Sequence, residues 1–395
     1  MKGFFRRVRE KSGTPGSWMY ALIFLIVRLW QGKRQRVEID DAALRELKAP
    51  YILLANHESF FDFYYISQMA HPSRPTYLVN EYYCTRPILK TMAKKGGILS
   101  KKLFTKDLAA PVGILRAIRG GWSVVIFPEG RLSPDGRSNP IVEKGAAFYK
   151  KLNCDLVLVR IDGAYFAAPK WRRRSYRSTI SLKVARVIGK EELHALPNEE
   201  LDRLIAETLY NDASETVQRR YPQPDKAERL EGLLYRCADC GALYTTVGRA
   251  NTFCCTACGA KRSFDERYRF DASPYTIGEY YDRIAALERD TLADFSLRAD
   301  VRTRIFGANG GAVRREEGVC ELTPACFHYR SGSADFTIPT GALPALAFSC
   351  GKEFELYHEN ELYYFYPKEH PQQAARWALL VDLLRKKREE EKNRE

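Results

Sequence analysis

The sequence lacks any apolar run long enough to cross a bilayer, which takes about 20 consecutive apolar residues. The longest candidate, residues 18–30, falls short of that length and has Trp18 and Trp30 at its ends, where interfacial aromatic residues commonly lie. Residues 31–34 do not supply the small residues of a signal-peptide cleavage site. We therefore expect a helix that lies in one leaflet, with a buried core helix as the alternative.

Negatively charged residues are outnumbered, because the sequence has 49 Asp and Glu against 63 Lys and Arg. The net charge is +14 and the pI is near 9.2. This excess favours an anionic partner, which can be nucleic acid, a membrane surface or a phosphorylated substrate. Basic residues flank the apolar segment at positions 6–11 and 33–36, and a further cluster lies at 170–177. Basic flanks beside an apolar segment favour anionic lipid. The sequence thus predicts a peripheral, monotopic protein on the cytoplasmic face of the cell membrane.

The ten cysteines do not have the spacing of a disulfide framework. Cys237 with Cys240, and Cys255 with Cys258, form two Cys-x-x-Cys-Gly knuckles. Two thiolates on one tight turn are half of a tetrahedral zinc site, and the Gly permits the positive φ that the turn requires. Cys254 competes with Cys255 as a ligand, although only Cys255 completes a knuckle. The pattern predicts a zinc ribbon whose Zn is structural, in a reducing compartment.

Two apolar runs end in polar residues that can perform chemistry. Tyr51–Ala55 is followed by Asn56-His57-Glu58-Ser59-Phe60-Phe61-Asp62, and Ser123–Phe127 by Pro128-Glu129-Gly130-Arg131. A His with a nearby carboxylate is a general base that is held in one tautomer and stabilised once protonated. Two strand ends with polar residues form an active-site rim. A satisfied core His is the alternative, but the order of the two motifs favours catalysis by His57 and Asp62.

At these residues the chain resembles the glycerolipid acyltransferase family, typified by bacterial lysophosphatidate (1-acyl-sn-glycerol-3-phosphate) acyltransferase. The family signature is a His and an Asp separated by four residues, followed by a Phe-Pro-Glu-Gly block, here residues 127–130. Lys144-Gly145-Ala146 resembles the Lys-Gly-Ala segment of the family, and Leu156–Ile161 its fourth, hydrophobic block. The resemblance covers about residues 45–220.

The resemblance implies transfer of a fatty acyl group from acyl-CoA or an acyl carrier protein thioester to the free hydroxyl of a lysophospholipid. The favoured acceptor is 1-acylglycerol-3-phosphate, which would give phosphatidate. It implies His57 and Asp62 as catalytic residues, with no metal in the chemistry. The implied substrate-binding residues are Asn56, Lys101, Lys102, Phe127, Pro128, Glu129, Gly130, Arg131, Lys144 and Gly145. Arg131 stands one place earlier than in the family, and Lys101 and Lys102 stand where its second block usually ends in Arg.

Strands alternate with helical stretches from residue 51 to 188, which predicts an α/β acyltransferase sandwich with a largely parallel sheet. A further amphipathic helix is expected over Leu201–Gln218. The expected organisation is a membrane-associating segment (1–45), an acyltransferase domain (46–222), a zinc ribbon (231–266), a connecting helix (267–299) and a C-terminal β domain with a terminal helix (300–395).

Short alternating strands between residues 301 and 366, followed by a helix that carries Trp377, predict an all-β C-terminal domain. This domain resembles pleckstrin-homology or GRAM domains, and an unrelated small β-barrel or sandwich capped by a helix is the alternative. The alternative function is that of a zinc-ribbon protein that binds nucleic acid, or binds lipid through the C-terminal β domain, and has a non-catalytic transferase fold. Nucleic acid is disfavoured because basic clusters flank an apolar segment and do not form one aromatic-studded face.

Overall fold

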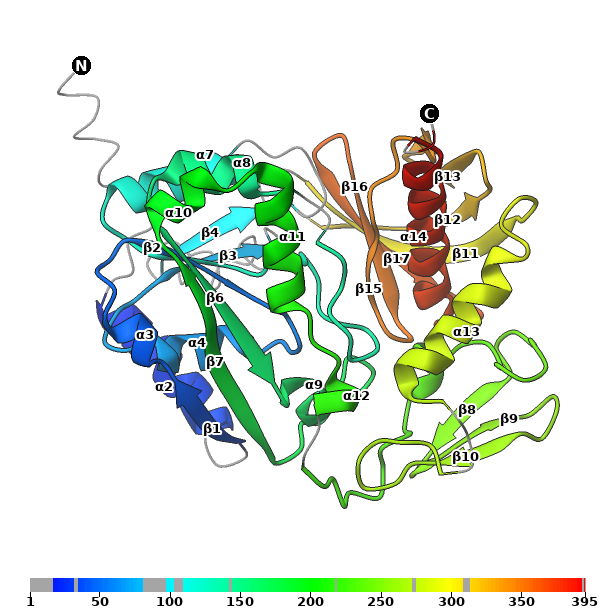
Figure 1. Cartoon of the computed structure of the whole chain (residues 1–395). Coiled ribbons are helices and arrows are strands. Elements are labelled where there is room, and N and C mark those ends of the chain that lie inside the picture. The colour runs from blue at the N-terminus through cyan, green and yellow to red at the C-terminus, as the bar shows by residue number, and fades with distance from the viewer. Residues whose placement is uncertain are drawn as a thin grey trace. The chain divides into compact units, whose positions relative to one another are not determined.

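The computed structural model describes residues 17–31, 35–80, 97–102, 109–141, 144–216, 219–271, 275–307, 313–392 and 394. The chain forms two compact units, which are drawn together in Figure 1. Unit 1 comprises Met1–Ala168 and Ser175–Arg219, and unit 2 comprises Pro169–Arg174 and Arg220–Glu395.

Unit 1 is built on a mixed sheet of seven strands (Figure 1). They are β1 (Gln35–Asp40), β2 (Tyr51–Ala55), β3 (Thr76–Asn80), β4 (Ile98–Lys101), β5 (Val124–Ile126), β6 (Asp155–Asp162) and β7 (Ser178–Ile188). The spatial order is β1-β7-β6-β2-β5-β3-β4. The strands from β6 to β4 run parallel, whereas β7 is antiparallel to β6 and pairs in parallel with β1. The predicted α/β sandwich with a largely parallel sheet is confirmed, and β1 and β4 are strands that the sequence did not predict.

Helices cover both faces of this sheet. Those that bound one core are α2 (Ser17–Gln31), α3 (Ala42–Arg45), α4 (Asp62–Met69) and α9 (Ala164–Ala167). Those that bound the other are α7 (Ala109–Arg119), α8 (Ala146–Leu152), α10 (Lys190–Ala195) and α11 (Asn198–Leu209). Because neighbouring side chains of a strand point to opposite faces, Leu53 of β2 joins one core and Leu54 the other. All five residues of β2 are buried, which explains why the strand is a continuous apolar run.

The helix expected over Leu201–Gln218 is interrupted. Helix α11 ends at Leu209, and the short α12 (Ala213–Thr216) follows it. Between them, the backbone N–H of Asn211 donates to Ser138 Oγ at 3.0 Å, and Asp212 forms a β-bridge with Arg137. The chain leaves the helix because these contacts with a distant loop replace intrahelical bonds. Gln218 lies outside the described residues.

Among the described side chains of the N-terminal helix α2, those of one face pack against the rest of unit 1. Tyr20 donates from its hydroxyl to Ser67 Oγ at 3.0 Å, and the ring of Phe24 lies 5.0 Å from that of Tyr64. Its other face exposes four large apolar side chains, Leu22, Leu25, Ile26 and Leu29. In the part of the chain that the structure describes, no helix combines the length and the apolar character that crossing a membrane requires.

Unit 2 contains a small antiparallel sheet in the order β10-β9-β8. Its strands are β8 (Thr246–Arg249), β9 (Thr252–Cys255) and β10 (Lys261–Ser263). Helix α13 (Ile277–Arg289) follows and begins at a capping box, in which Thr276 accepts from Glu279 N at 3.2 Å and Glu279 accepts from Thr276 N at 2.6 Å.

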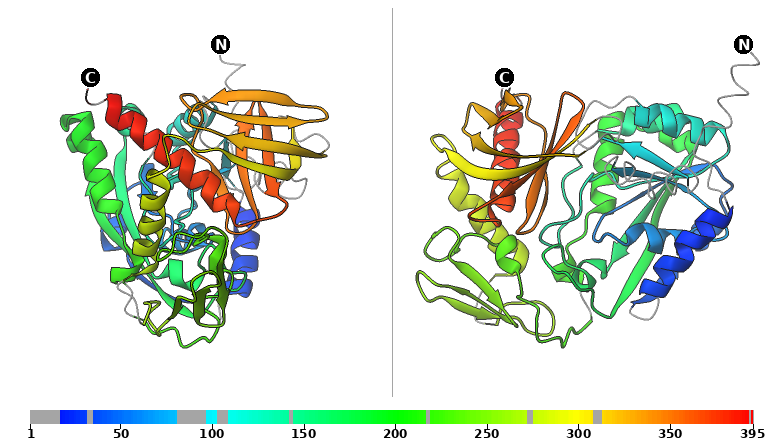
Figure 2. Two further views of the ribbon diagram at one scale, coloured as in Figure 1. Left: turned by 90° about the vertical axis from the view of Figure 1, so that its right-hand side faces the viewer. Right: turned by 180° about the vertical axis from the view of Figure 1, so that it is seen from behind.

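Residues 297–392 of unit 2 form an antiparallel half-barrel capped by a helix, which confirms the predicted all-β domain with a terminal helix (Figure 2). Its strands are β11 (Leu297–Phe306), β12 (Arg314–Leu322), β13 (Cys326–Ser331), β14 (Asp335–Pro339), β15 (Ala347–Ser349), β16 (Glu353–His358) and β17 (Glu361–Pro367). The cap is α14 (Gln373–Lys392), whose Trp377 stacks on Phe354 with ring centroids 4.9 Å apart. The likeness to pleckstrin-homology or GRAM domains stays a prediction.

Three further contacts hold unit 2 together. Buried Glu288 of α13 pairs with Arg236, beside the first knuckle, at 3.4 Å and with Arg376 of α14 at 3.1 Å. Trp171, which lies in the sequence between two parts of unit 1, is buried in unit 2 and donates from Nε1 to Lys226 O at 3.4 Å. The ribbon, the two helices and the segment Pro169–Arg174 therefore belong to one packed body.

Candidate functional site

The two sequence motifs meet at the carboxyl edge of the parallel strands in unit 1. Strands β2 and β5 are hydrogen-bonded neighbours, with Leu54 opposite Ile126, so the residues that follow them lie close together. The backbone N–H of His57 donates to Glu129 Oε1 at 2.8 Å, which joins the motifs directly.

His57 and Asp62 form a hydrogen-bonded pair. His57 Nδ1 lies 2.9 Å from Asp62 Oδ2, and Asp62, the first residue of α4, is fully buried. Its carboxylate also accepts from Glu58 N at 2.7 Å, Ser59 N at 2.9 Å and Ser59 Oγ at 2.8 Å. An ionised carboxylate can only accept, so Nδ1 carries the proton and Nε2 of His57 is left as the basic nitrogen.

Phe127 fixes the other side of the histidine ring. The two rings stack with centroids 4.2 Å apart and an interplanar angle of 16°. The His57 side chain keeps 21% exposure, whereas Asp62 has none. The imidazole ring of His57 is therefore held in one plane while its side chain stays partly exposed.

Glu129 lies beneath this pair and is 3% exposed. Its Oε2 accepts from the backbone N of Asn139 at 2.6 Å and from Asn139 Nδ2 at 3.0 Å. Burial raises the pKa of the Glu129 carboxyl to about 7, although the N–H donors of Asn139 and His57 oppose that rise. Both carboxylate oxygens are thus committed to protein donors.

The residues around Glu129 shape the turn. Gly130 has φ +70°, in the left-handed region that favours glycine, and Pro128 precedes Glu129 in the turn. Arg131 follows and donates from Nε to Asn139 Oδ1 at 3.1 Å. The turn therefore places Arg131 on the same edge of the sheet as His57.

The other predicted substrate-binding residues lie in different surroundings. Asn56 is buried, and its amide exchanges hydrogen bonds of 2.8 and 2.7 Å with the backbone of Ile161 in β6. Lys101 ends β4 opposite Asn80 of β3, and Lys102 follows it, both half-exposed on the carboxyl edge.

The Lys-Gly-Ala segment lies at the start of α8. The N–H groups of Gly145 and Ala146 donate to Asp202 Oδ1 at 3.0 and 2.9 Å, and Lys144 is exposed. The segment is thus anchored to α11. The roles of all these residues in binding stay predictions.

Glu58 is a component of the site that the sequence reasoning missed. It is 4% exposed, and its Oε2 accepts from Ala164 N at 2.8 Å and Tyr165 N at 2.9 Å. Its Oε1 accepts from Asn211 Nδ2 at 2.6 Å. Burial, with the charge of Asp62 next, raises the pKa of Glu58 well above its usual range. Glu58 fastens the loop that carries His57 to segments more than 100 residues away.

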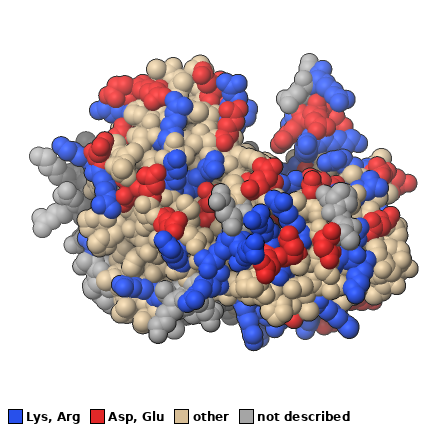
Figure 3. All heavy atoms as spheres, turned by 60° about the horizontal axis from the view of Figure 1, so that its bottom comes forward, with Lys and Arg blue, Asp and Glu red and all other residues tan. Residues whose placement is uncertain are grey.

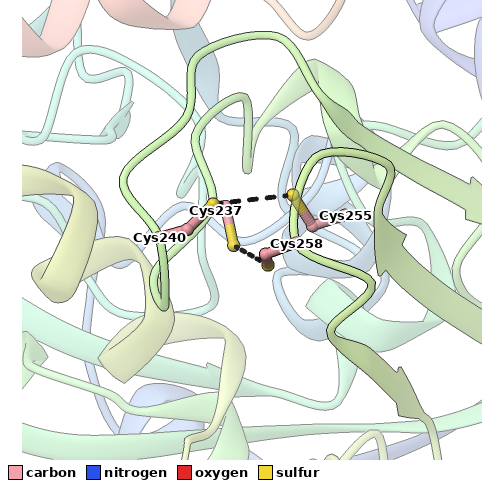
Figure 4. Close-up of side chains that lie close together, drawn as sticks. All are labelled: Cys237, Cys240, Cys255 and Cys258. Atoms are coloured by element: carbon pink, nitrogen blue, oxygen red, sulfur yellow. Dashed lines mark hydrogen bonds between the residues drawn. The ribbon is translucent and has the colours of Figure 1, made fainter.

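The four predicted zinc ligands come together in unit 2 (Figure 4). Cys237 Sγ lies 3.8 Å from Cys258 Sγ, Cys240 Sγ lies 3.8 Å from Cys255 Sγ, and all four sulfurs lie within 4.8 Å of one another. In a tetrahedral site with Zn–S bonds of about 2.3 Å, neighbouring sulfurs lie about 3.8 Å apart. The cluster can therefore bind a structural metal such as Zn.

Two further observations concern the ligand set. Burial raises the pKa of the Cys255 thiol, but the Thr245 hydroxyl at 3.2 Å and backbone N–H groups lower it by more. The net result is a pKa of about 6, below the ordinary value of a cysteine. This favours the thiolate, which is the metal-binding form. Cys254, the competing candidate, places its Sγ 3.7 Å from Val247 O and is not one of the four clustered residues.

A buried carboxylate that orients a histidine at the edge of a largely parallel sheet is the arrangement of a general-base enzyme. The model of the family described as Acyltransferase matches residues 34–159, so this part of the chain is similar to the domains of that family. Among solved structures, the chain is similar to the 1-acyl-sn-glycerophosphate (LPA) acyltransferase PlsC from Thermotoga maritima, with 18% identity and a TM-score of 0.41. That match covers 50% of this chain and 78% of the other.

Proposed function

We propose that unit 1 transfers a fatty acyl group from an acyl thioester to the free hydroxyl of a lysophospholipid. The favoured acceptor is 1-acylglycerol-3-phosphate, with phosphatidate as the product. The observation that carries this proposal is the 2.9 Å contact between His57 Nδ1 and the buried Asp62, which leaves Nε2 as a general base on the rim.

The reaction needs no covalent acyl-enzyme. His57 Nε2 removes the proton of the acceptor hydroxyl while the hydroxyl oxygen bonds to the thioester carbonyl carbon. The C–S bond then breaks, and the leaving thiolate takes the proton back from the imidazolium. The products are the new ester and the free carrier thiol, from either coenzyme A or an acyl carrier protein. Asp62 stabilises the imidazolium throughout.

Basic side chains on the same edge support an acceptor that carries phosphate. Arg131 follows β5, Lys101 ends β4 and Lys102 follows it, so three cationic groups lie at or beyond the carboxyl ends of parallel strands. The planar fork of Arg suits phosphate oxygens in a bidentate contact.

A membrane surface supplies such an acceptor, and α2 supports attachment to it. Its exposed apolar residues, Leu22, Leu25, Ile26 and Leu29, recur at spacings of three, four and seven, on one side of the helix. The net positive charge of the chain adds attraction to anionic lipid. Figure 3 shows Lys and Arg side chains in several groups, with Asp and Glu side chains among them. The proposed location is the cytoplasmic face of the membrane, with the metal of unit 2 serving the fold alone.

The test is a product analysis of the purified protein offered a panel of lysolipids with both coenzyme A and carrier-protein thioesters. Phosphatidate formed from 1-acylglycerol-3-phosphate, and absent with the His57→Ala variant, supports the proposal. Binding of lipid or nucleic acid by the wild-type protein without turnover of any lysolipid overturns it in favour of a non-catalytic binding protein.

A further inference from the structure

Asn139 connects the two halves of the site and has no role in the proposal above. It lies in the loop after β5 and is 8% exposed. Its backbone N and its Nδ2 both donate to Glu129 Oε2, and Nδ2 also lies 3.3 Å from Arg131 O. Its Oδ1 accepts from Arg131 Nε at 3.1 Å. Every polar atom of the side chain therefore has a partner in the site.

Asn139 contacts Glu129, which binds the backbone of His57, and it also contacts the guanidinium of Arg131. Glu129 Oε2 accepts a hydrogen bond from the backbone N–H of Asn139, and Glu129 Oε1 accepts one from the backbone N–H of His57 at 2.8 Å. Arg131 is held at Nε, which fixes the plane of its guanidinium. A planar fork engages two phosphate oxygens in one orientation only, so fixing its plane orders the acceptor before it binds.

We propose that Asn139 is a positioning residue that sets the Arg131 guanidinium for a phosphate-monoester acceptor and holds it in register with His57 through Glu129. The inference rests on the proposed function, because it assigns the acceptor phosphate to Arg131. It also assigns Glu129 to positioning, since both of its oxygens are occupied by protein N–H groups.

The experiment compares 1-acylglycerol-3-phosphate with monoacylglycerol, which has the hydroxyl but no phosphate. Asn139→Ala removes the partner of Arg131 Nε, so the acceptor KM for the phosphate substrate should rise roughly tenfold or more. The donor KM and the turnover of monoacylglycerol should change much less, so the preference for the phosphate substrate falls. Asn139→Asp retains an oxygen for Arg131 Nε and should recover part of that preference.

Ser138→Ala is the matched control, because its hydroxyl donates to Leu209 O and accepts from Asn211 N, away from Glu129 and Arg131. A merely structural Asn139 would lower thermal stability and affect both acceptors equally, which overturns the proposal. If Asn139→Ala fails to fold, Arg131→Lys removes the same Nε–Oδ1 bond at a half-exposed position, and an unchanged preference then overturns it.

Equilibrium binding separates this inference from the proposed function. Should the wild-type protein bind 1-acylglycerol-3-phosphate without turning it over, the proposed function fails. Weaker binding of the phosphate ligand by Asn139→Ala than by the Ser138→Ala control still supports the role of Asn139, and equal binding overturns it.

Discussion

Two buried carboxyl groups of the site, those of Asp62 and Glu129, have different surroundings. Asp62 accepts from the backbone N–H groups of Glu58 and Ser59 and pairs with His57. Glu129 also accepts N–H donors, yet burial still raises its pKa to about 7. Asp62 is therefore suited to stabilise the protonated imidazole of His57, and Glu129 is suited to hold the backbone of His57 and Asn139 in place.

The pairing of His57 with Asp62 could be predicted because four intervening residues bring a loop side chain and the first residue of α4 together. The position of Glu129 beside the pair followed from the parallel strands. The contacts of Glu58 and Asn139 could not be predicted, since they depend on backbone N–H groups and turns whose directions only the folded chain defines.

Replacing His57 by alanine should lower the rate of acyl transfer by about 10²–10⁴-fold, because the hydroxyl loses its base. The folded state should persist, since the His57 side chain is on the rim. Steady-state kinetics and thermal unfolding measure the two effects. His194→Ala, at an exposed histidine, is the control and should keep full activity; near-normal activity of His57→Ala would remove this residue from the mechanism.

Glu129 should make stability fall as the pH rises from about 4.5 to about 7. In that window the folded state retains a proton that the unfolded state releases, so the free energy of unfolding decreases, by at most about 1.4 kcal/mol per pH unit. Glu129→Gln should remove this slope, in urea unfolding at several pH values. The exposed Glu199→Gln variant is the control, and equal slopes in wild type and Glu129→Gln would contradict the prediction.

At the level of elements, the apolar runs of β2, β5 and β6 and the alternating strands of the half-barrel were predictable from their periods of burial. The burial of β1 follows a weak pattern, with four of six residues exposed, so its sequence gave little sign of a strand. The break after α11 escaped prediction because Asn211 bonds to a loop more than 70 residues away.

The double variant Leu25→Glu/Leu29→Glu should bind anionic vesicles at least about tenfold more weakly than the wild-type protein. Two apolar side chains are then lost from the lipid contact, and two negative charges are repelled by the anionic headgroups. These residues are 49% and 75% exposed, so the fold should be kept. Co-sedimentation measures the binding. Val112→Glu, at another exposed apolar position, is the control. Unchanged binding by the double variant would assign attachment to another surface.

The cysteine cluster should bind one zinc per chain, and Cys237→Ser/Cys240→Ser should abolish it, because two thiolates do not complete the site. The ribbon should lose order, since small domains of this kind bury too little surface without metal. Elemental analysis and hydrogen exchange measure both effects. Cys254→Ser is the matched control. Loss of acyl transfer by a soluble double variant would show that the ribbon contributes to the active site.

At the level of the whole molecule, the division into units does not follow the order of the sequence. Pro169–Arg174 belongs to unit 2, although the residues before and after it belong to unit 1. Trp171 is 1% exposed there, and Arg172 pairs with Asp225 at 2.5 Å. Sequence reasoning could see a basic cluster at this position but not the buried tryptophan within it, since its partners are distant in the chain.

Trp171→Ala should therefore destabilise unit 2, by about 3–5 kcal/mol for a fully buried tryptophan. Hydrogen exchange should speed up in residues 221–235 and leave the sheet of unit 1 protected. Trp122→Ala, which removes a tryptophan packed against the core of unit 1, should give the opposite distribution. Faster exchange in unit 1 with Trp171→Ala would mean that the segment supports unit 1 instead.

The same segment sets an order of events during synthesis. Trp171 leaves the ribosome while most of unit 2 is still to be made. The sheet of unit 1 can therefore form before the residues that bury Trp171 exist. At typical elongation rates the residues from Trp171 to Lys226, whose carbonyl accepts from the Trp171 side chain, take roughly 3 to 11 s, during which this side chain meets water or a chaperone. A nascent chain of this protein therefore exposes a large apolar side chain until the parts of unit 2 that bury Trp171 have been translated.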